Sequence, residues 1–140
     1  MKLASAALLS TAVAAAGISG ASALDSDAVA VELYFEAFCP GCHEFITQDL
    51  AAALKDDEIA NIMNVTLVPY GNARTSGTTV SCQHGEDECK GNTWELCGID
   101  QAGDAFSAYW PYMHCMETEF TDMLSNTQKC AKSGKLDYSR

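Results

Sequence analysis

Two short apolar runs stand out along the chain and predict buried strands. Residues 28–38 (AVAVELYFEAF) and residues 62–68 (IMNVTLV) are rich in β-branched and aromatic side chains. Pro69-Tyr70-Gly71 follows the second run and predicts a turn. The polar, glycine-bearing residues 71–79 then predict a loop.

The remaining pattern is helical. The first predicted helix covers residues 43–54, because its apolar residues recur at helical spacing: Phe45, Ile46, Leu50, Ala53 and Leu54. Further helices are predicted over residues 86–96, 104–120 and 123–131. We expect Pro111 to bend or restart the third of these four helices, and Ser133-Gly134-Lys135 to end the last. Two strands with this set of helices indicate a mixed α/β (α+β) protein.

A dithiol motif joins the first strand to the first helix. Cys39-Pro40-Gly41-Cys42 follows the strand directly, and Pro40 suits the first turn of a helix, where its missing N–H costs nothing. Strand, CxxC and helix in this order are the opening of a thioredoxin fold. Since that fold needs more strands than the two predicted, we expect a thioredoxin-like domain over residues 24–140 that is incomplete at its C-terminal strands.

The N-terminal residues 1–23 are typical of a secretory signal peptide. Lys2 supplies the positive charge, Leu3 to Ile18 is apolar, and Ala21-Ser22-Ala23 is a cleavage site of the A-x-A type. The alternative is a retained amphipathic anchor. Because no later segment is long and apolar enough to span a bilayer, we expect a chain that begins at Leu24 and makes no membrane contact.

Charge and cysteine content narrow the functional class. The formal charge is −11, and −12 once Lys2 is removed, which disfavours nucleic acid and anionic lipid as partners. Seven cysteines in a secreted chain indicate an oxidising compartment and a disulfide framework. Five of them are disulfide candidates, and their odd number leaves at least one unpaired: Cys82, Cys89, Cys97, Cys115 and Cys130. Asn64-Val65-Thr66 is a candidate N-glycosylation site at Asn64.

The spacing of Cys39 and Cys42 suits thiol–disulfide exchange. Cys39 at a helix N-terminus would have its thiolate stabilised by free N–H groups and would attack, while Cys42, one turn further on, would resolve the mixed disulfide. His43 reads as an exposed helix residue without a role, or as a source of positive charge. The alternative for the motif itself is a plain disulfide or a metal site. A zinc set would comprise Cys39, Cys42, Cys82 and His84, but it lacks the usual second compact ligand pair.

Residues 82–97 carry the most specific motif, C-Q-H-G-x₂-E-C-x₂-N-x₄-C. With the CxxC motif, and with the strand and turn of residues 65–73, this segment resembles the gamma-interferon-inducible lysosomal thiol reductase family over about residues 31–134. His84 and Asn92 are expected to satisfy backbone groups between disulfides, although His84 beside the dithiol is the alternative.

The resemblance implies a reductase of protein disulfides in lysosomes, vacuoles or related acidic vesicles, or after secretion. It implies Cys39 as nucleophile, Cys42 as resolving thiol, a small thiol as electron donor and no cofactor. It also implies a helical, disulfide-bonded insertion, here residues 82–131, and a later cis-proline strand and cysteine partner that this chain does not contain. A fragment or a shortened variant would explain that difference. The competing hypothesis is therefore a non-catalytic, disulfide-stabilised secreted interaction protein.

Overall fold

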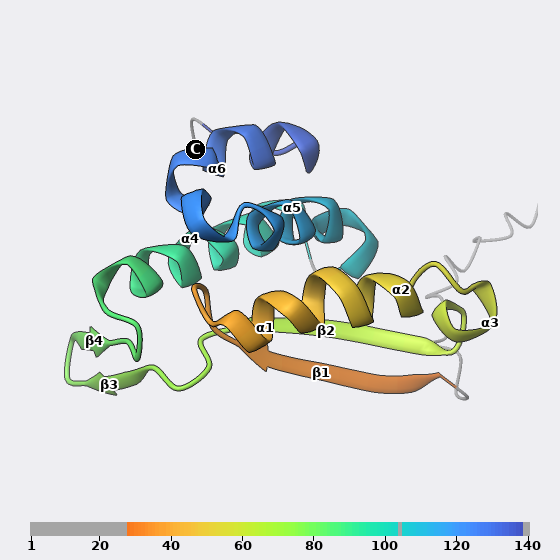
Figure 1. Ribbon diagram of the computed structural model, residues 1–140, viewed down its shortest axis with the longest axis horizontal. Coiled ribbons are helices and arrows are strands. Elements are labelled where there is room, and N and C mark those ends of the chain that lie inside the picture. Colours follow the sequence, from red (N-terminus) through yellow and green to blue (C-terminus); the bar gives the residue numbers. More distant parts are fainter. Residues whose placement is uncertain (1–27, 104, 139–140) are drawn as a thin grey trace, which may run out of the picture.

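A computed structural model describes residues 28–103 and 105–138 (Figure 1). The expected signal peptide and its cleavage site therefore lie outside the described residues. Within them, a two-stranded parallel sheet carries helices on one face, and a separate hairpin projects from one end. This arrangement confirms the mixed α/β class.

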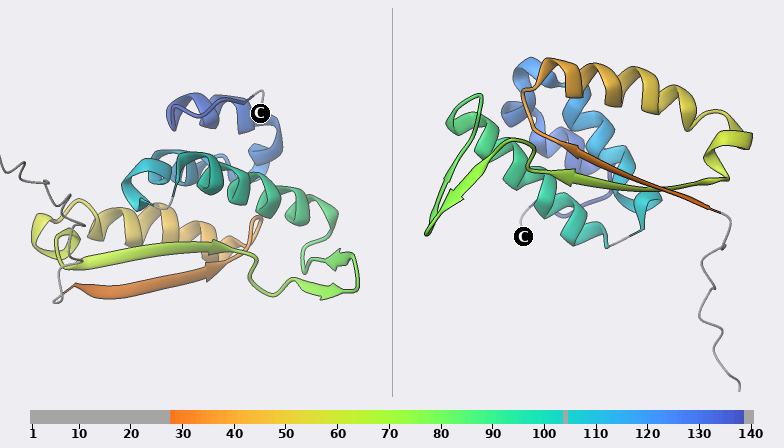
Figure 2. Two further views of the ribbon diagram at one scale, coloured as in Figure 1. Left: turned by 180° about the vertical axis from the view of Figure 1, so that it is seen from behind. Right: turned by 90° about the horizontal axis from the view of Figure 1, so that it is seen from below.

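The sheet pairs β1 (Val29–Phe35) with β2 (Met63–Pro69), the two strands that the apolar runs predict. Their register sets Val31 opposite Val65 and Leu33 opposite Leu67. Burial alternates along β2, where Val65 and Leu67 are buried and Asn64 and Thr66 are exposed. One face of the sheet therefore packs against the helices and the other faces solvent, as two views of the ribbon show (Figure 2).

Parallel strands need a crossover connection, and a helical segment provides it. It runs through α1 (Pro40–Glu44), the π-helical segment η1 (Phe45–Leu50) and α2 (Ala51–Ala53), and buries Ile46 and Leu50. This segment confirms the helix predicted over residues 43–54. A further turn of helix, α3 (Asp57–Ala60), was not predicted; the Asp56 side chain caps it by accepting from the N–H groups of Glu58 and Ile59.

The prediction of a loop over residues 71–79 was wrong. This region contains β3 (Arg74–Ser76) and β4 (Thr79–Ser81), which form an antiparallel hairpin. Gly77 has φ +60° and opens the two-residue connection between the strands. All residues of both strands are exposed, so the hairpin has no apolar alternation from which to predict it.

Three long helices and a short turn complete the described fold: α4 (Glu86–Ala102), α5 (Phe106–Thr118), the 3₁₀ turn η2 (Phe120–Asp122) and α6 (Met123–Ser133). Helix α4 extends six residues beyond its predicted end at residue 96. Helix α5 continues through Pro111, so the predicted restart at this residue does not occur. The buried core lies between these helices and the sheet, and includes Tyr109, Met113, Met116 and Met123. No helix among the described residues is both long and apolar enough to cross a membrane.

Candidate active site

The dithiol, Cys39 and Cys42, lies at the start of α1, shortly after β1 ends. Cys39 is the N-cap residue of α1, and Pro40 occupies its first turn. The backbone N–H of Cys42 donates to Cys39 Sγ at 3.4 Å, so the first turn of the helix points a donor at this sulfur. Both thiols are free and half-buried. The structure thus places Cys39 at the N-terminus of α1, as the sequence predicts.

Cys42 differs from Cys39 in its surroundings. Burial, the hydrogen bond to Cys39 and the negative charge of Glu117 raise the pKa of the Cys42 thiol to about 12. Cys42 is therefore protonated at physiological pH, and a protonated thiol is a poor nucleophile.

Glu95 on α4 and Glu117 on α5 form a buried carboxyl pair, and the charge of Glu117 acts on the Cys42 thiol. Both residues are 0 % exposed. Burial raises the pKa of Glu117 to about 7, while burial and the neighbouring Glu117 raise the pKa of Glu95 well above its usual value. Among the described residues no N–H or O–H group donates to their four oxygens, so a carboxyl proton shared within the pair is the available donor.

Sequence reasoning missed this pair. The available signal was periodicity: Glu117 lies one residue after Met116 and four after Met113, both of which are fully buried. Glu117 thus belongs to the apolar face of its helix. A charged residue on such a face is unusual enough to mark a functional or structural site.

Residues of the 82–97 motif hold the loop that precedes Cys39. The Ala37 N–H donates to Asn92 Oδ1 at 2.8 Å, a buried bond between the loop and α4. Gly91 lets the helix approach closely, because a Cβ at this position would lie 2.6 Å from the Ala37 Cβ. Asn92 satisfies a backbone group, as expected, but this group lies in the loop before Cys39 and not between the disulfides.

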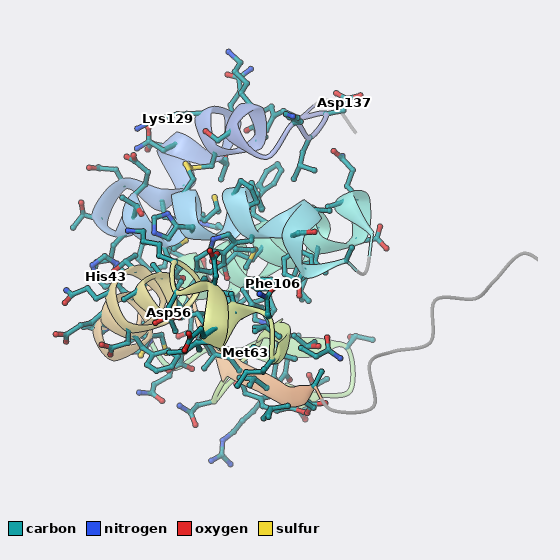
Figure 3. All side chains as sticks on the ribbon, turned by 90° about the vertical axis from the view of Figure 1, so that its right-hand side faces the viewer. His43, Asp56, Met63, Phe106, Lys129 and Asp137 are labelled. Carbon is teal, nitrogen blue, oxygen red and sulfur yellow. A yellow bond between two sulfur atoms is a disulfide. The ribbon has the colours of Figure 1, made fainter. Side chains whose placement is uncertain are left out.

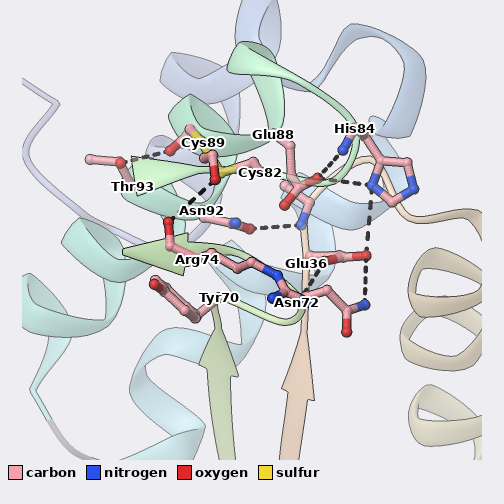
Figure 4. The surroundings of a disulfide bond; sticks show 12 residues. Glu36, Tyr70, Asn72, Arg74, Cys82, His84, Glu88, Cys89, Asn92 and Thr93 are labelled. Atoms are coloured by element: carbon pink, nitrogen blue, oxygen red, sulfur yellow. Dashed lines mark hydrogen bonds and ion pairs between the residues drawn. A yellow bond between two sulfur atoms is a disulfide. The ribbon is translucent and has the colours of Figure 1, made fainter. Parts of the chain in front are cut away.

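His84 also connects the motif to this loop. Its Nδ1 lies 2.9 Å from Glu88 Oε2 and 3.7 Å from Glu36 Oε1, and its backbone N–H donates to Glu88 Oε2 at 2.5 Å (Figure 4). Glu36 in turn accepts from the Asn72 N–H at 2.8 Å and from Asn72 Nδ2 at 3.3 Å. His84 therefore contacts the residue three positions before Cys39.

The prediction of an exposed His43 was wrong. It is half-buried, and its Nδ1 lies 2.7 Å from the Glu117 carbonyl oxygen, to which it can donate. Its ring also lies 4.7 Å from that of Phe120. His43 thus connects the helix that carries the dithiol to the end of α5; Figure 3 labels its position.

The five remaining cysteines form two disulfides and leave one thiol. Cys82 pairs with Cys89 at the start of α4, and Cys115 pairs with Cys130 to join α5 to α6. Cys97 is free and exposed on α4. Since Cys82 is oxidised, the zinc set of Cys39, Cys42, Cys82 and His84 does not form in this state. Asn64, the candidate glycosylation residue, is exposed on β2.

Fold and site together define a mixed α/β protein with a free CxxC dithiol at a helix N-terminus and a disulfide-bonded helical region packed beside it. Residues 30–134 match the family described as gamma interferon inducible lysosomal thiol reductase (GILT). The chain belongs to this family, which confirms the resemblance.

Individual relatives agree. The chain is 42 % identical over 106 residues to the gamma-interferon-inducible lysosomal thiol reductase of Carassius auratus, covering 73 % of this chain and 40 % of the relative. It is 42 % identical over 95 residues to the gamma-interferon-responsive lysosomal thiol protein of Arabidopsis thaliana, covering 67 % of this chain and 40 % of the relative. It is 37 % identical over 113 residues to GILT-like protein 2 of Drosophila melanogaster, covering 80 % of this chain and 52 % of the relative. The match thus spans about half or less of the length of these relatives.

Proposed function

We propose that this chain is a thiol–disulfide oxidoreductase that reduces protein disulfides through Cys39 and Cys42. The observation that carries the proposal is the free Cys39 thiol at the N-cap of α1, with the Cys42 N–H directed at its sulfur. Membership of the thiol reductase family supports it. Residues 82–131 would then serve as the helical, disulfide-bonded insertion of a thioredoxin-like domain.

The reaction follows from the two thiols. The Cys39 thiolate attacks one sulfur of a substrate disulfide, forms a mixed disulfide and releases the other substrate sulfur as a thiolate. Cys42 then loses its proton and attacks Cys39 Sγ, which releases the second substrate thiol and leaves a Cys39–Cys42 disulfide. A small thiol supplies the two electrons that restore the dithiol. No cofactor is required.

An acidic compartment such as the lysosome is the proposed place of action, as the family's description suggests, and there Glu117 would gain a proton. Ionised Glu117 opposes formation of the Cys42 thiolate, because its negative charge raises the pKa of that thiol. Below the Glu117 pKa of about 7 the carboxyl gains a proton, and this repulsion weakens. The expected secretion signal and glycosylation at Asn64 would fit the same route.

Turnover of a disulfide substrate tests the proposal. Reduction of insulin with a small-thiol donor, measured at about pH 5 and about pH 7, should occur with the wild-type chain and fall to background in Cys39→Ser. The matched control is Cys97→Ser, which removes a free, exposed thiol outside the CxxC motif and should keep the wild-type rate. A folded wild-type chain that is inert at both pH values would favour the non-catalytic interaction protein instead.

A further inference from the structure

Three side chains from separate segments meet beside the active-site loop. Glu36 follows β1, His84 lies in the loop before α4, and Glu88 lies in the first turn of α4. One ligand atom from each can be chosen so that all three lie within 4.8 Å of one another. Figure 4 shows the three side chains pointing toward a common point.

The charges of this cluster do not balance. The Glu36 side chain is 3 % exposed and that of Glu88 is fully buried, yet among the described residues His84 is the ion-pair partner of both. The other ion pairs among the described residues, Lys90–Asp87 and Lys129–Glu119, include no residue of this cluster. Two buried carboxylates thus share at most one positive charge, and buried charge without compensation is costly.

The hydrogen bonds also leave room for another partner. Glu88 Oε1 is buried and has no hydrogen-bond partner within the part of the chain that the structure describes. Both Glu36 oxygens accept from Asn72, which fixes the orientation of the carboxylate without adding charge. Outer contacts of this kind orient carboxylates that bind metals.

We propose that Glu36, His84 and Glu88 form a binding site for a divalent cation, with Zn²⁺ as the best match. An imidazole nitrogen with two carboxylate oxygens suits zinc, whereas Ca²⁺ and Mg²⁺ prefer oxygen ligands throughout. Ligands about 2.05 Å from a tetrahedral zinc lie roughly 3.3 Å apart. The observed separations from His84 Nδ1, 2.9 Å and 3.7 Å, fall on either side of this value. The partly exposed His84 side offers a path of entry.

Binding would join the loop before Cys39 to helix α4. Glu36 contributes its side chain to the cluster and its carbonyl oxygen to a 3.4 Å hydrogen bond with the Cys39 N–H. The next residue, Ala37, is already bound to Asn92. An ion at the cluster would therefore stabilise the folded chain without contacting either active-site sulfur.

The test must separate this site from the thiols, which bind zinc themselves. Calorimetric titration of ZnCl₂ into the full chain carrying Cys39→Ser, Cys42→Ser and Cys97→Ser should show one zinc per chain. Adding His84→Ala or Glu88→Gln should weaken the affinity at least about tenfold. Glu86→Gln is the matched control, because Glu86 is an exposed acid in the same helical turn.

Thermal unfolding gives an independent readout. Excess zinc should raise the melting temperature of the triple-serine chain and of Glu86→Gln, but not that of His84→Ala. His84→Ala changes a partly exposed side chain, so it keeps the test decisive even where Glu88→Gln fails to fold. Absence of stoichiometric zinc in the folded chain, or binding unchanged in His84→Ala, would overturn the proposal and leave a cluster neutralised by protons.

Discussion

At the scale of single residues, the cysteines of the site can be predicted from the sequence, but its buried glutamates cannot. Cys39 and Cys42 are recognisable in the sequence as a CxxC motif between a predicted strand and a predicted helix, supported by the 82–97 motif. Glu95 and Glu117 are not, because only tertiary packing brings their helices together and buries both carboxyls. Their raised pKa values are a property of the fold and lead to a pH dependence.

Glu117→Gln should make the stability of the folded protein less sensitive to rising pH. A carboxyl whose pKa is raised in the folded state binds its proton more tightly there than in the unfolded chain. Its favourable contribution to the unfolding free energy is therefore fully present below about pH 4.5 and is lost as the pH rises through about 7. Relative to wild type, the variant should therefore gain up to about 3 kcal/mol in unfolding free energy between pH about 4.5 and about 7.5.

Urea unfolding at both pH values measures this difference. Glu44→Gln is the control, since this exposed glutamate on α1 should change the unfolding free energy by less than about 0.5 kcal/mol. A wild-type-minus-variant difference that does not depend on pH would show that Glu117 is not buried as a protonated acid.

At the scale of elements, local pattern predicted the two strands and the helical segments, including the position of the CxxC motif. The hairpin of β3 and β4 could not be predicted, since its strands are short and exposed and follow from the Gly77 turn. The function of the 82–97 motif also depended on long-range packing: Gly91 and Asn92 contact Ala37, some 55 residues earlier in the chain.

Gly91→Ala tests that packing. The added methyl group would lie 2.6 Å from the Ala37 Cβ and 3.2 Å from Met123 Sδ, so α4 must move away from the active-site loop. We expect a loss of about 1–3 kcal/mol in unfolding free energy, measured by chemical denaturation. Gly41→Ala provides the contrast, because nothing lies within 4 Å of its added Cβ and α1 should tolerate or gain from it. Equal effects of the two substitutions would contradict a close contact at Gly91.

At the scale of the whole molecule, the family was predictable from sequence, because its motif is long and specific, and the match over residues 30–134 confirms it. The disulfide pairing was not predictable, since five cysteines allow many arrangements until the helices are placed. The structure joins α5 to α6 through Cys115–Cys130 and anchors α4 through Cys82–Cys89, while Cys39 and Cys42 stay free thiols. A stable framework next to a reactive pair is the arrangement that the proposed reduction requires.

Trapping the mixed disulfide is the most direct test of that reaction. Cys42→Ser should still attack substrate through Cys39 but cannot resolve the product, so non-reducing mass spectrometry should detect a covalent complex linked through Cys39. Cys39→Ser should form none, and wild-type chain should show it only transiently. The account predicts accumulation in Cys42→Ser alone; a complex that forms equally in Cys39→Ser, or in neither variant, would contradict it.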